Sequence, residues 1–559
     1  MKFKIIIFSI FLFSNVQLRS QGEQGGKFSG NFETNVNFYE RDDRIGANTE
    51  VYKKAKSSVD AWLFLNYELN GFQFSARFDG FQNSPLLNPQ GMYTKQGLGF
   101  WQVSKTIDKY QITAGYFYEQ FGSGMLFRAY EDRNIGIDFA IQGVKVKANL
   151  NENLKLKVFS GQQKGNILTS DRFDVTPQVL TGMNLEQRVN IKDVTLDLGA
   201  SAINKVLDNA TLNRLVTDIN ALPLESRFLP KYNTYSFNGY GTMQYKNLSL
   251  YGEYCYKTPE AIFDLNNNMY NSDGNIIFGS ASYSAQGIGK KKKSSIGFNT
   301  QYKRIDNFRF RTTPYETLLN GMVSYLPSIT RQNTYRLLAR YNSVVQEQGE
   351  QAFQADLVFT PIKGTTFIAN ASYVESLKQN GLNNAPQKLY HELYFEVQHK
   401  FKRNDKGQQW AVKGGVQNIF YNQDVYEVKP GAKNVRASTP FAEVTYKFKK
   451  TKSFRLETQY LETKQDLGSF INLILEYNMA PHWSFAIGDM VNHKPYRSAN
   501  TTVSDEIIHY YSAFIGYTQG ATKVTIAYIK QVEGVNCTGG ICRVEPAFSG
   551  LRVNMSSSF

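Results

Sequence analysis

The sequence is poor in cysteine and histidine, and beyond its first residues it lacks long apolar runs. After the apolar stretch 5–13, no segment reaches the roughly 18 consecutive apolar residues that a membrane-spanning helix needs. This absence excludes insertion through apolar helices. The chain nevertheless contains 40 Phe and 35 Tyr. High aromatic content without long apolar runs favours a β-barrel, because barrel strands turn only every second residue toward lipid.

Only three cysteines are present. Cys537 and Cys542 lie in the motif CTGGIC, where the short spacing and an oxidising compartment favour a disulfide within a small loop, with free thiols as the alternative. Cys255 is left without a partner. No second Cys or His pair stands near these positions at the spacing of metal ligands, so we predict neither a metal nor a cofactor.

The five histidines lie in separate predicted strands or near strand ends. No G-x-S-x-G or H-E-x-x-H motif occurs, which argues against an enzyme. We expect these side chains to line the lumen or the membrane interface. The histidines are His391, His399, His482, His493 and His509.

The N-terminus has the pattern of a secretory signal peptide. Lys2 and Lys4 precede the apolar run, and small Ser20 offers a cleavage point, so we predict a signal peptide over 1–20 and a single mature domain over 21–559. No Cys stands at the boundary, which disfavours a lipid anchor. The net charge of +15 would suit nucleic acid, lipopolysaccharide phosphates or an anion-selective lumen, and secretion argues against nucleic acid.

The last residues alternate without error between apolar and polar side chains. Leu551, Val553 and Met555 would share one face of a strand, opposite Arg552 and Asn554, and the chain stops on Phe559. This is the pattern of the closing strand of an outer-membrane barrel, and such barrels resemble this chain in carrying a terminal aromatic that the barrel-assembly machinery reads. We therefore predict location in the cell outer membrane, in contact with its lipid.

Similar alternation recurs from Phe28 onward, and Asn70-Gly71 between two alternating runs predicts a hairpin turn. We expect one all-β fold, a single large transmembrane antiparallel barrel of about 24 strands (22–26), with short periplasmic turns and long extracellular loops. Residues 305–332 are ambiguous, and fit either a strand with a periplasmic segment or an extra hairpin. Further short turns are predicted near 108, 151, 192–193, 247, 363–364, 406–407, 450, 481 and 519–520, and long loops at about 40–57, 82–96, 119–136, 161–180, 204–233, 258–293, 421–437, 492–507 and 532–549.

The segment 115–138 is the best candidate for a loop folded into the lumen. It is rich in aromatic residues that solvent would not favour, and Gly122 and Gly124 permit a sharp reversal. Its charged side chains are expected to pair in a low-dielectric setting. We interpret it as a constriction, with a substrate-contacting eyelet as the alternative and catalysis as the least favoured. The charged residues are Glu119, Arg128, Glu131, Asp132 and Arg133.

The segment 258–293 contains an Asn- and Asp-rich stretch that lacks the order and the terminal Glu of an EF-hand, so a solvated loop is favoured over a calcium site. It ends in four lysines. We expect these to lie at the outer-leaflet rim in contact with lipopolysaccharide phosphates, although such a run is also compatible with simple solvation. They are Lys290, Lys291, Lys292 and Lys293.

Four segments resemble an uncharacterised outer-membrane β-barrel family of Bacteroidota that carries a domain of unknown function. They are GYFYEQFGSGMLFRAYEDRNIGID at 115–138, RIDNFRFR at 304–311, LPSITRQNTYRL at 326–337 and CTGGICRVEPAFSG at 537–550. The resemblance implies an outer-membrane barrel and supplies no catalytic residues. A TonB-dependent receptor is disfavoured, because such receptors resemble a barrel preceded by a plug, and here strands begin at Phe28.

Two functions from different classes remain. The first is a porin-like channel or passive transporter for small polar solutes, favoured by the wide predicted barrel. The second is a scaffold barrel that docks envelope protein partners through its long loops, for secretion, surface retention or adhesion. An outer-membrane enzyme is a third possibility, and it would need a His beside a carboxylate and a Ser at the outer rim.

Overall fold

A computed structural model describes residues 25–87, 91–165, 171–264, 266–289, 293–377, 386–404, 407–496, 506–538 and 541–559. The predicted signal peptide lies outside these residues.

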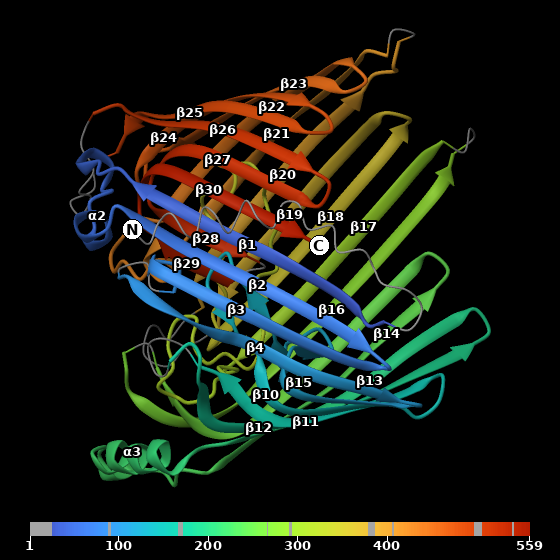
Figure 1. Cartoon of the computed structure of the whole chain (residues 1–559), viewed down its shortest axis with the longest axis vertical. Coiled ribbons are helices and arrows are strands. Elements are labelled where there is room, and N and C mark those ends of the chain that lie inside the picture. Colours follow the sequence, from blue (N-terminus) through green and yellow to red (C-terminus); the bar gives the residue numbers. More distant parts are fainter. Residues whose placement is uncertain are drawn as a thin grey trace.

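In the described residues, 24 strands form one antiparallel sheet in which sequence neighbours pair and the last strand pairs with the first (Figure 1). The predicted fold class and strand number are confirmed. The strands are β1 (Lys27–Tyr39), β2 (Ser57–Leu69), β3 (Phe72–Ser84), β4 (Tyr93–Ile107), β5 (Tyr110–Phe117), β10 (Ile141–Asn149), β11 (Leu154–Lys164), β12 (Val175–Ile191), β13 (Val194–Val206), β14 (Asn233–Tyr245), β15 (Leu248–Phe263), β16 (Met269–Ile288), β17 (Ser294–Asp306), β18 (Gly349–Ile362), β19 (Thr365–Ser376), β20 (Lys388–Lys400), β21 (Gln409–Tyr421), β22 (Val435–Lys449), β23 (Lys452–Thr463), β24 (Gly468–Met479), β25 (Trp483–Pro495), β26 (Ile508–Gln519), β27 (Thr522–Gln531) and β30 (Phe548–Ser558).

The barrel closes where β1 meets β30. Val36 lies opposite Val553 in this register. The Gly30 N–H donates to the Phe559 carbonyl at 2.8 Å, and the Phe559 N–H donates back at 3.0 Å. A Cβ on Gly30 would fall 2.4 Å from the Phe559 ring, so a larger residue here would displace that ring. The C-terminal alternation correctly predicted the closing strand, and the role of Phe559 in assembly stays a prediction.

Each wall strand separates an apolar outer face from a polar inner face. On β3, Phe74 and Phe78 are 42% and 49% exposed on the outer face, while Arg77 and Asp79 are buried on the inner one. The same division places Lys145 inward and exposed Val144 outward on β10. The period of two in the sequence is therefore the division between a membrane-facing belt and the lumen.

An aromatic girdle borders this belt near the short turns between β21 and β27. Trp410 stacks on Tyr446 with ring centroids 4.2 Å apart, and Phe454 stacks on Tyr477 at 4.8 Å. Such girdles form at the boundary between hydrocarbon and headgroups, because an aromatic ring with a polar atom suits both environments.

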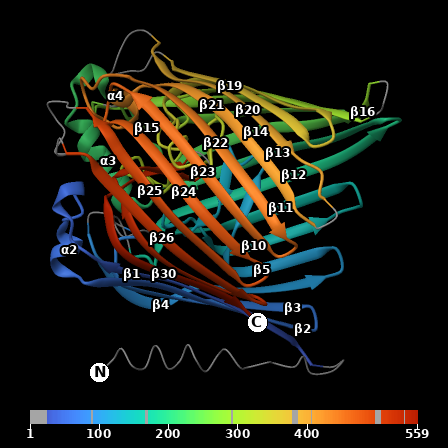
Figure 2. The same cartoon turned by 90° about the horizontal axis from the view of Figure 1, so that it is seen from above.

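The connections have different lengths at the two ends of the barrel. One end carries the short turns, including Asn70-Gly71 as predicted. The opposite end carries the long connections and the helices, which Figure 2 shows gathered there. None of the helices in the described part of the chain has both the length and the apolar character to cross a membrane. The remaining elements are η1 (Asp43–Ile45), α2 (Glu50–Lys54), α3 (Asn209–Asn220), η2 (Leu224–Ser226), α4 (Gln423–Tyr426), β6 (Glu119–Phe121), β7 (Phe127–Ala129), β8 (Glu131–Asp132), β9 (Ile137–Asp138), β28 (Gly534–Thr538) and β29 (Ile541–Glu545).

The predicted long loop over 258–293 is wrong, because most of it is wall. β15 extends to Phe263 and β16 begins at Met269, so only a short connection separates them. The next connection joins β16 to β17, with Ile288 opposite Ser294, and belongs to the end of the short turns. Lys290, Lys291 and Lys292 lie outside the described residues. Lys293 follows the β16–β17 connection, among the short turns, and the lipopolysaccharide contact stays a prediction.

Candidate functional site

Two long segments leave the wall and run along its inner face. The first, 118–140, connects β5 to β10 and is called the 118–140 segment below. The second, 307–348, connects β17 to β18 and is called the 307–348 segment; the ambiguous stretch 305–332 falls mostly within it and forms neither of the two expected structures. Both hydrogen-bond to side chains that stand on the polar face of the wall strands. The contacts of these segments with the wall define the candidate site.

The 118–140 segment reverses on itself as predicted. Strands β6 and β7 pair with Phe121 opposite Phe127. Gly122 and Gly124 make the turn with φ of +53° and +95°, a region that L side chains rarely adopt. The Phe127 ring stacks on Phe159 of β11 with centroids 4.8 Å apart, and the apolar side of the hairpin is buried against the wall. The aromatic residues that made this loop unsuited to solvent thus pack on the inner face.

Glu119 is held by three lysines of β10 and β11. Its carboxylate lies 3.2 Å from Lys145 Nζ, 3.0 Å from Lys147 Nζ and 3.5 Å from Lys157 Nζ. Burial alone would raise the pKa of Glu119, but the three ammonium groups outweigh it and lower the pKa to about 2. The carboxylate is therefore ionised at neutral pH and compensates a strongly basic part of the wall.

A buried ion network fixes the far end of the same segment to β3 and β11. The Arg77 guanidinium donates to Asp79 at 2.6 Å, to Glu131 at 2.7 Å and to Asp138 at 2.8 Å. Lys164 Nζ donates to the same Asp138 carboxylate at 2.8 Å. Burial would raise the pKa of Asp138, but the cations around it, Lys164 first, hold it well below its usual range. The predicted pairing of charges at low dielectric is confirmed for Glu131.

The other predicted charged residues make different contacts. Arg133 donates to Glu33 of β1 at 2.6 Å and to Glu131 at 3.1 Å. Arg128 stands over the rings of Tyr130 and Tyr325, with its guanidinium carbon 4.5 Å and 4.1 Å from their centroids. Asp132 accepts from the Asn134 N–H at 3.0 Å. Glu119, Glu131 and Arg133 thus contact side chains of wall strands, whereas Arg128 is held by aromatic rings and Asp132 contacts its own segment. Their role as a constriction stays a prediction.

The 307–348 segment continues this packing across the barrel. Its backbone meets the first segment where the Arg128 N–H donates to the Val323 carbonyl and the Tyr325 N–H to the Gly124 carbonyl, each at 3.0 Å. Further along, Tyr335 Oη donates to Glu443 at 2.9 Å, and the Leu337 N–H donates to the Gln459 amide at 2.7 Å. These partners lie on β22 and β23, far around the wall from β3. Wall side chains such as Gln459 therefore accept hydrogen bonds from backbone N–H groups of a segment that forms none of the named strands.

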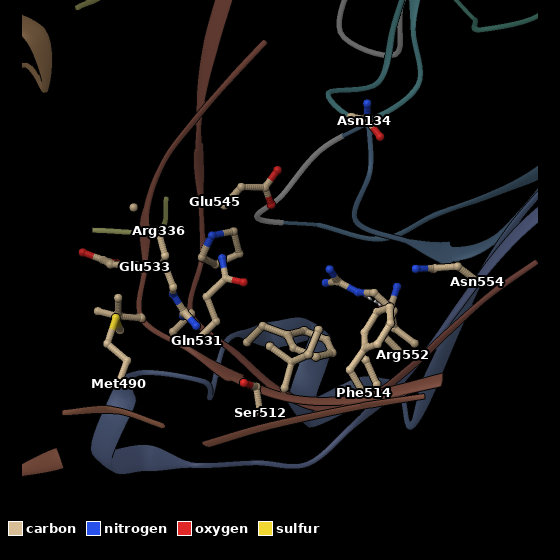
Figure 3. A pocket seen from close by; sticks show the side chains of 18 of the residues that line it. Asn134, Arg336, Met490, Ser512, Phe514, Gln531, Glu533, Glu545, Arg552 and Asn554 are labelled. Carbon is tan, nitrogen blue, oxygen red and sulfur yellow. Dashed lines mark hydrogen bonds between the residues drawn. The ribbon is translucent and has the colours of Figure 1, made fainter. Parts of the chain in front are cut away.

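A cavity of about 990 Å³ remains beside these two segments, against β1, β2 and β23 to β30. Figure 3 shows Arg336 and Gln531 on one side of it and Arg552 and Asn554 on the other. Six arginines line the cavity, namely Arg133, Arg336, Arg340, Arg455, Arg543 and Arg552, against the carboxylates Asp60, Glu476, Glu533 and Glu545. Its lining combines these charged groups with apolar side chains such as Leu337 and Met490, and the sequence did not predict it.

Most of these arginines have partners. Arg340 pairs with Asp466 at 2.9 Å, Arg455 with Glu476 at 2.7 Å and Arg543 with Glu545 at 2.5 Å. Arg552 donates to the Asn37 amide oxygen at 2.9 Å. Arg336 differs, because its Nη2 is buried and has no hydrogen-bond partner among the described residues.

The remaining sequence predictions concern cysteines and histidines. Cys537 lies opposite Cys542 in the β28–β29 register, but their side chains are outside the described residues, so the disulfide stays a prediction. Cys255 is buried and free. His509 Nδ1 lies 2.7 Å from Asp489 Oδ2, without a serine hydroxyl bonded to it among the described residues. The same residues contain no group of three or more His, Cys, Asp and Glu placed to hold a metal ion.

Comparison with known proteins gives a family and several barrels of distant likeness. The model of a family of unknown function (DUF6029) matches residues 1–559. No curated protein matches the chain. Among solved structures, the siderophore receptor PirA from Pseudomonas aeruginosa is 9% identical with a TM-score of 0.42, covering 97% of this chain and 81% of that one. The P pilus usher PapC is 10% identical with a TM-score of 0.41, covering 95% and 99%. OccK5 (OpdH) of Pseudomonas aeruginosa is 10% identical with a TM-score of 0.34, covering 78% and 99%.

Proposed function

The chain belongs to a family of unknown function, DUF6029, and from its own geometry we propose that it is a channel or passive transporter for small polar solutes in the outer membrane. The cavity of about 990 Å³ inside a closed barrel, with six arginines in its lining, carries this proposal. A barrel of 24 strands encloses more space than its wall side chains fill, so something else must occupy or obstruct it. The 118–140 and 307–348 segments would do so, as an obstruction that leaves one polar path.

The way these segments are held supports a transport role over a purely structural filling. Their contacts with the wall include many ion pairs and side-chain hydrogen bonds, such as those of Glu119 and Tyr335. Paired groups of this kind are costly to separate, so they would give a solute path fixed sides. A solute path along the charged side of the 307–348 segment, between Arg336 and Arg552, would then orient polar molecules by their charge.

The proposal is tested by single-channel recording of the refolded full chain in planar bilayers across a potassium chloride gradient. We expect discrete ohmic steps with a measurable reversal potential, whose sign gives the selectivity of the lumen. A barrel verified by its heat-dependent shift on gels that conducts no ions in any recording would contradict the channel.

One observation favours the second candidate, a scaffold that docks envelope proteins. The connection between β13 and β14 carries α3 and exposes Leu224 and Leu229, which are 79% and 86% exposed. Large apolar side chains so exposed at one end of a barrel are suited to a protein partner. A photoreactive residue at Leu229 tests this function by crosslinking in cells, and capture of one defined envelope protein would favour it. The control is the same photoreactive residue at Leu318, which is 78% exposed on another connection and should not capture that protein.

A further inference from the structure

Several buried hydrogen-bond donors without partners lie together on the inner face of β24 to β26. Asn472, Met490 and Tyr510 form one row across these three strands, because Asn472 pairs with Met490 and Met490 with Tyr510. All three are nearly fully buried, and Met490 lines the cavity. Within the described part of the chain, neither Asn472 Nδ2 nor Tyr510 Oη has a hydrogen-bond partner.

The 307–348 segment brings two guanidinium groups to this row. The Arg340 guanidinium carbon lies 5.1 Å from the centroid of Phe470, whose ring is 6.3 Å from that of Tyr510. Both Arg336 and Arg340 line the cavity. Considering only the described residues, Arg336 Nη2 and Arg340 Nε lack hydrogen-bond partners. Two arginines of the 307–348 segment that line the cavity thus lie beside β24 to β26, where Asn472 and Tyr510 flank the cavity-lining Met490.

The two cations are compensated differently. Asp466 pairs with Arg340 at 2.9 Å, and no carboxylate among the described residues pairs with Arg336. Burial and the neighbouring positive charge of Arg340 lower the pKa of Arg336, so its surroundings do not favour a second cation. Arg336 is partly buried, and its buried Nη2 has neither an anion nor a hydrogen-bond partner among the described residues, which is costly because desolvation of a charge needs a compensating charge and hydrogen bonds. Water would satisfy the donors without supplying the charge.

We propose that Arg336, Arg340, Tyr510 and Asn472 form a binding subsite for the anionic group, a carboxylate or a phosphate, of a small solute. An oxyanion supplies several acceptor atoms and a negative charge at once, which matches donors in fork geometry. One acceptor without a partner, Asn492 Oδ1, stands in the next row of the same wall. The subsite deepens the proposed function, because it names the class of solute that the lumen would admit.

The test measures the thermal unfolding midpoint of the refolded full chain in detergent micelles at constant ionic strength. Succinate or inorganic phosphate replaces chloride in increasing amounts, and neutral succinamide is added at an unchanged chloride concentration. Since a ligand that binds only the folded state raises this midpoint, we expect succinate, phosphate or both to raise it and succinamide not to. A rise with succinate alone assigns a carboxylate, and a rise with phosphate alone a phosphate group. No rise with either anion, or an equal rise with succinamide, overturns the proposal.

Variants locate the effect. Arg336→Gln should lose at least about tenfold in anion affinity, as expected for the loss of a charge-assisted contact, while its unfolding midpoint without anion stays equal or rises. Arg188→Gln, a matched change at an arginine that pairs with Asp197 outside this cavity, should keep the full response. An undiminished response in Arg336→Gln would overturn the subsite. If that variant does not fold, the comparison of succinate with succinamide on the unaltered chain decides the proposal.

This binding measurement needs no ion conduction. A chain that binds the anions but does not conduct would keep the subsite and contradict the channel. A chain that conducts without responding to either anion would keep the channel and contradict the subsite.

Discussion

The inner wall of the barrel has two regions that treat charge differently. Along β3 to β17, beneath the 118–140 segment, buried cations such as Arg77 and Lys145 have carboxylate partners within hydrogen-bond distance. Beside the cavity, Arg336 of the 307–348 segment has a buried Nη2 without a hydrogen-bond partner, and no carboxylate among the described residues pairs with it. The first region has the charge balance of a permanent structure, and the proposed anion subsite would explain the imbalance of the second. The contrast teaches that packing and binding use the same residue types. They differ in whether the chain itself supplies the carboxylate that pairs with each cation.

The largest change should come from breaking the buried network of the packed region. Asp138→Asn leaves Arg77 and Lys164 buried with less compensation, and we expect it to lower the free energy of unfolding by about 3–5 kcal/mol. Urea titration of the micelle-bound barrel measures this. Asp197→Asn, which breaks the exposed pair with Arg188, is the control and should cost at most about 1 kcal/mol. Equal costs for the two variants would contradict the account of the packed region.

A smaller effect is expected from Glu119→Gln, which leaves three lysines facing one another. The loss should be about 2 kcal/mol in the free energy of unfolding, in the range of hydrogen bonds to charged groups. Glu186→Gln is the matched control, because this partly exposed carboxylate pairs with one lysine, Lys157 at 3.4 Å, and its other partners, Asn184 and Tyr240, are neutral. A cost for Glu186→Gln as large as that for Glu119→Gln would remove the special role given to Glu119.

The pH dependence of the unfolding free energy, compared between the unaltered chain and Glu119→Gln, tests the same role of Glu119. The pKa of Glu119 is lowered from 4.5 to about 2 by folding, so its stabilisation is complete above about pH 4.5 and is lost as the pH falls to about 2. The difference in unfolding free energy between the unaltered chain and Glu119→Gln should stay constant from pH 7 to about 4.5 and vanish below about 2. A difference that disappears near pH 6 would show that another group is responsible.

The smallest effect concerns the turn of the 118–140 segment. Gly122→Ala puts a Cβ at a φ of +53° and 2.9 Å from Glu253 Oε1, so we expect a loss of about 1–2 kcal/mol in the free energy of unfolding. Gly239→Ala is the control, since a Cβ there meets no heavy atom within 4 Å. The control should change the unfolding free energy by no more than about 1 kcal/mol. Loss of stability in Gly239→Ala alone would reverse the expected order.

Much of the wall could be predicted because its rule is local. Alternation over a single strand, as in β3, together with a turn dipeptide such as Asn70-Gly71, determines both pairing and face. The same rule explains the error at 258–293. The first residues of β16 include Asn271, Asp273 and Asn275, and such a polar stretch has the composition of a loop although it is part of the wall.

The inner segments and the subsite could be predicted only in part. The 118–140 segment could be predicted to be buried because it is rich in aromatic residues, and its reversal because it contains two glycines. The 307–348 segment alternates locally, with Phe308 and Phe310 buried between arginines, and so imitates a strand. Its backbone partners, such as Gln459, are far away in the sequence. Likewise, the meeting of Arg336 with Tyr510 depends on how the barrel closes, which no local pattern encodes.

The most direct test of the central claim, that the 118–140 segment obstructs the lumen, is the single-channel conductance of a chain that lacks residues 122–133. This deletion removes the tip of the segment, including Phe127 and Arg133, and leaves every wall strand intact. The account predicts ohmic steps larger than those of the unaltered chain, because the obstructed cross-section widens while the wall stays closed. An equal conductance from a verified barrel would show that the segment does not limit the lumen and would contradict the claim.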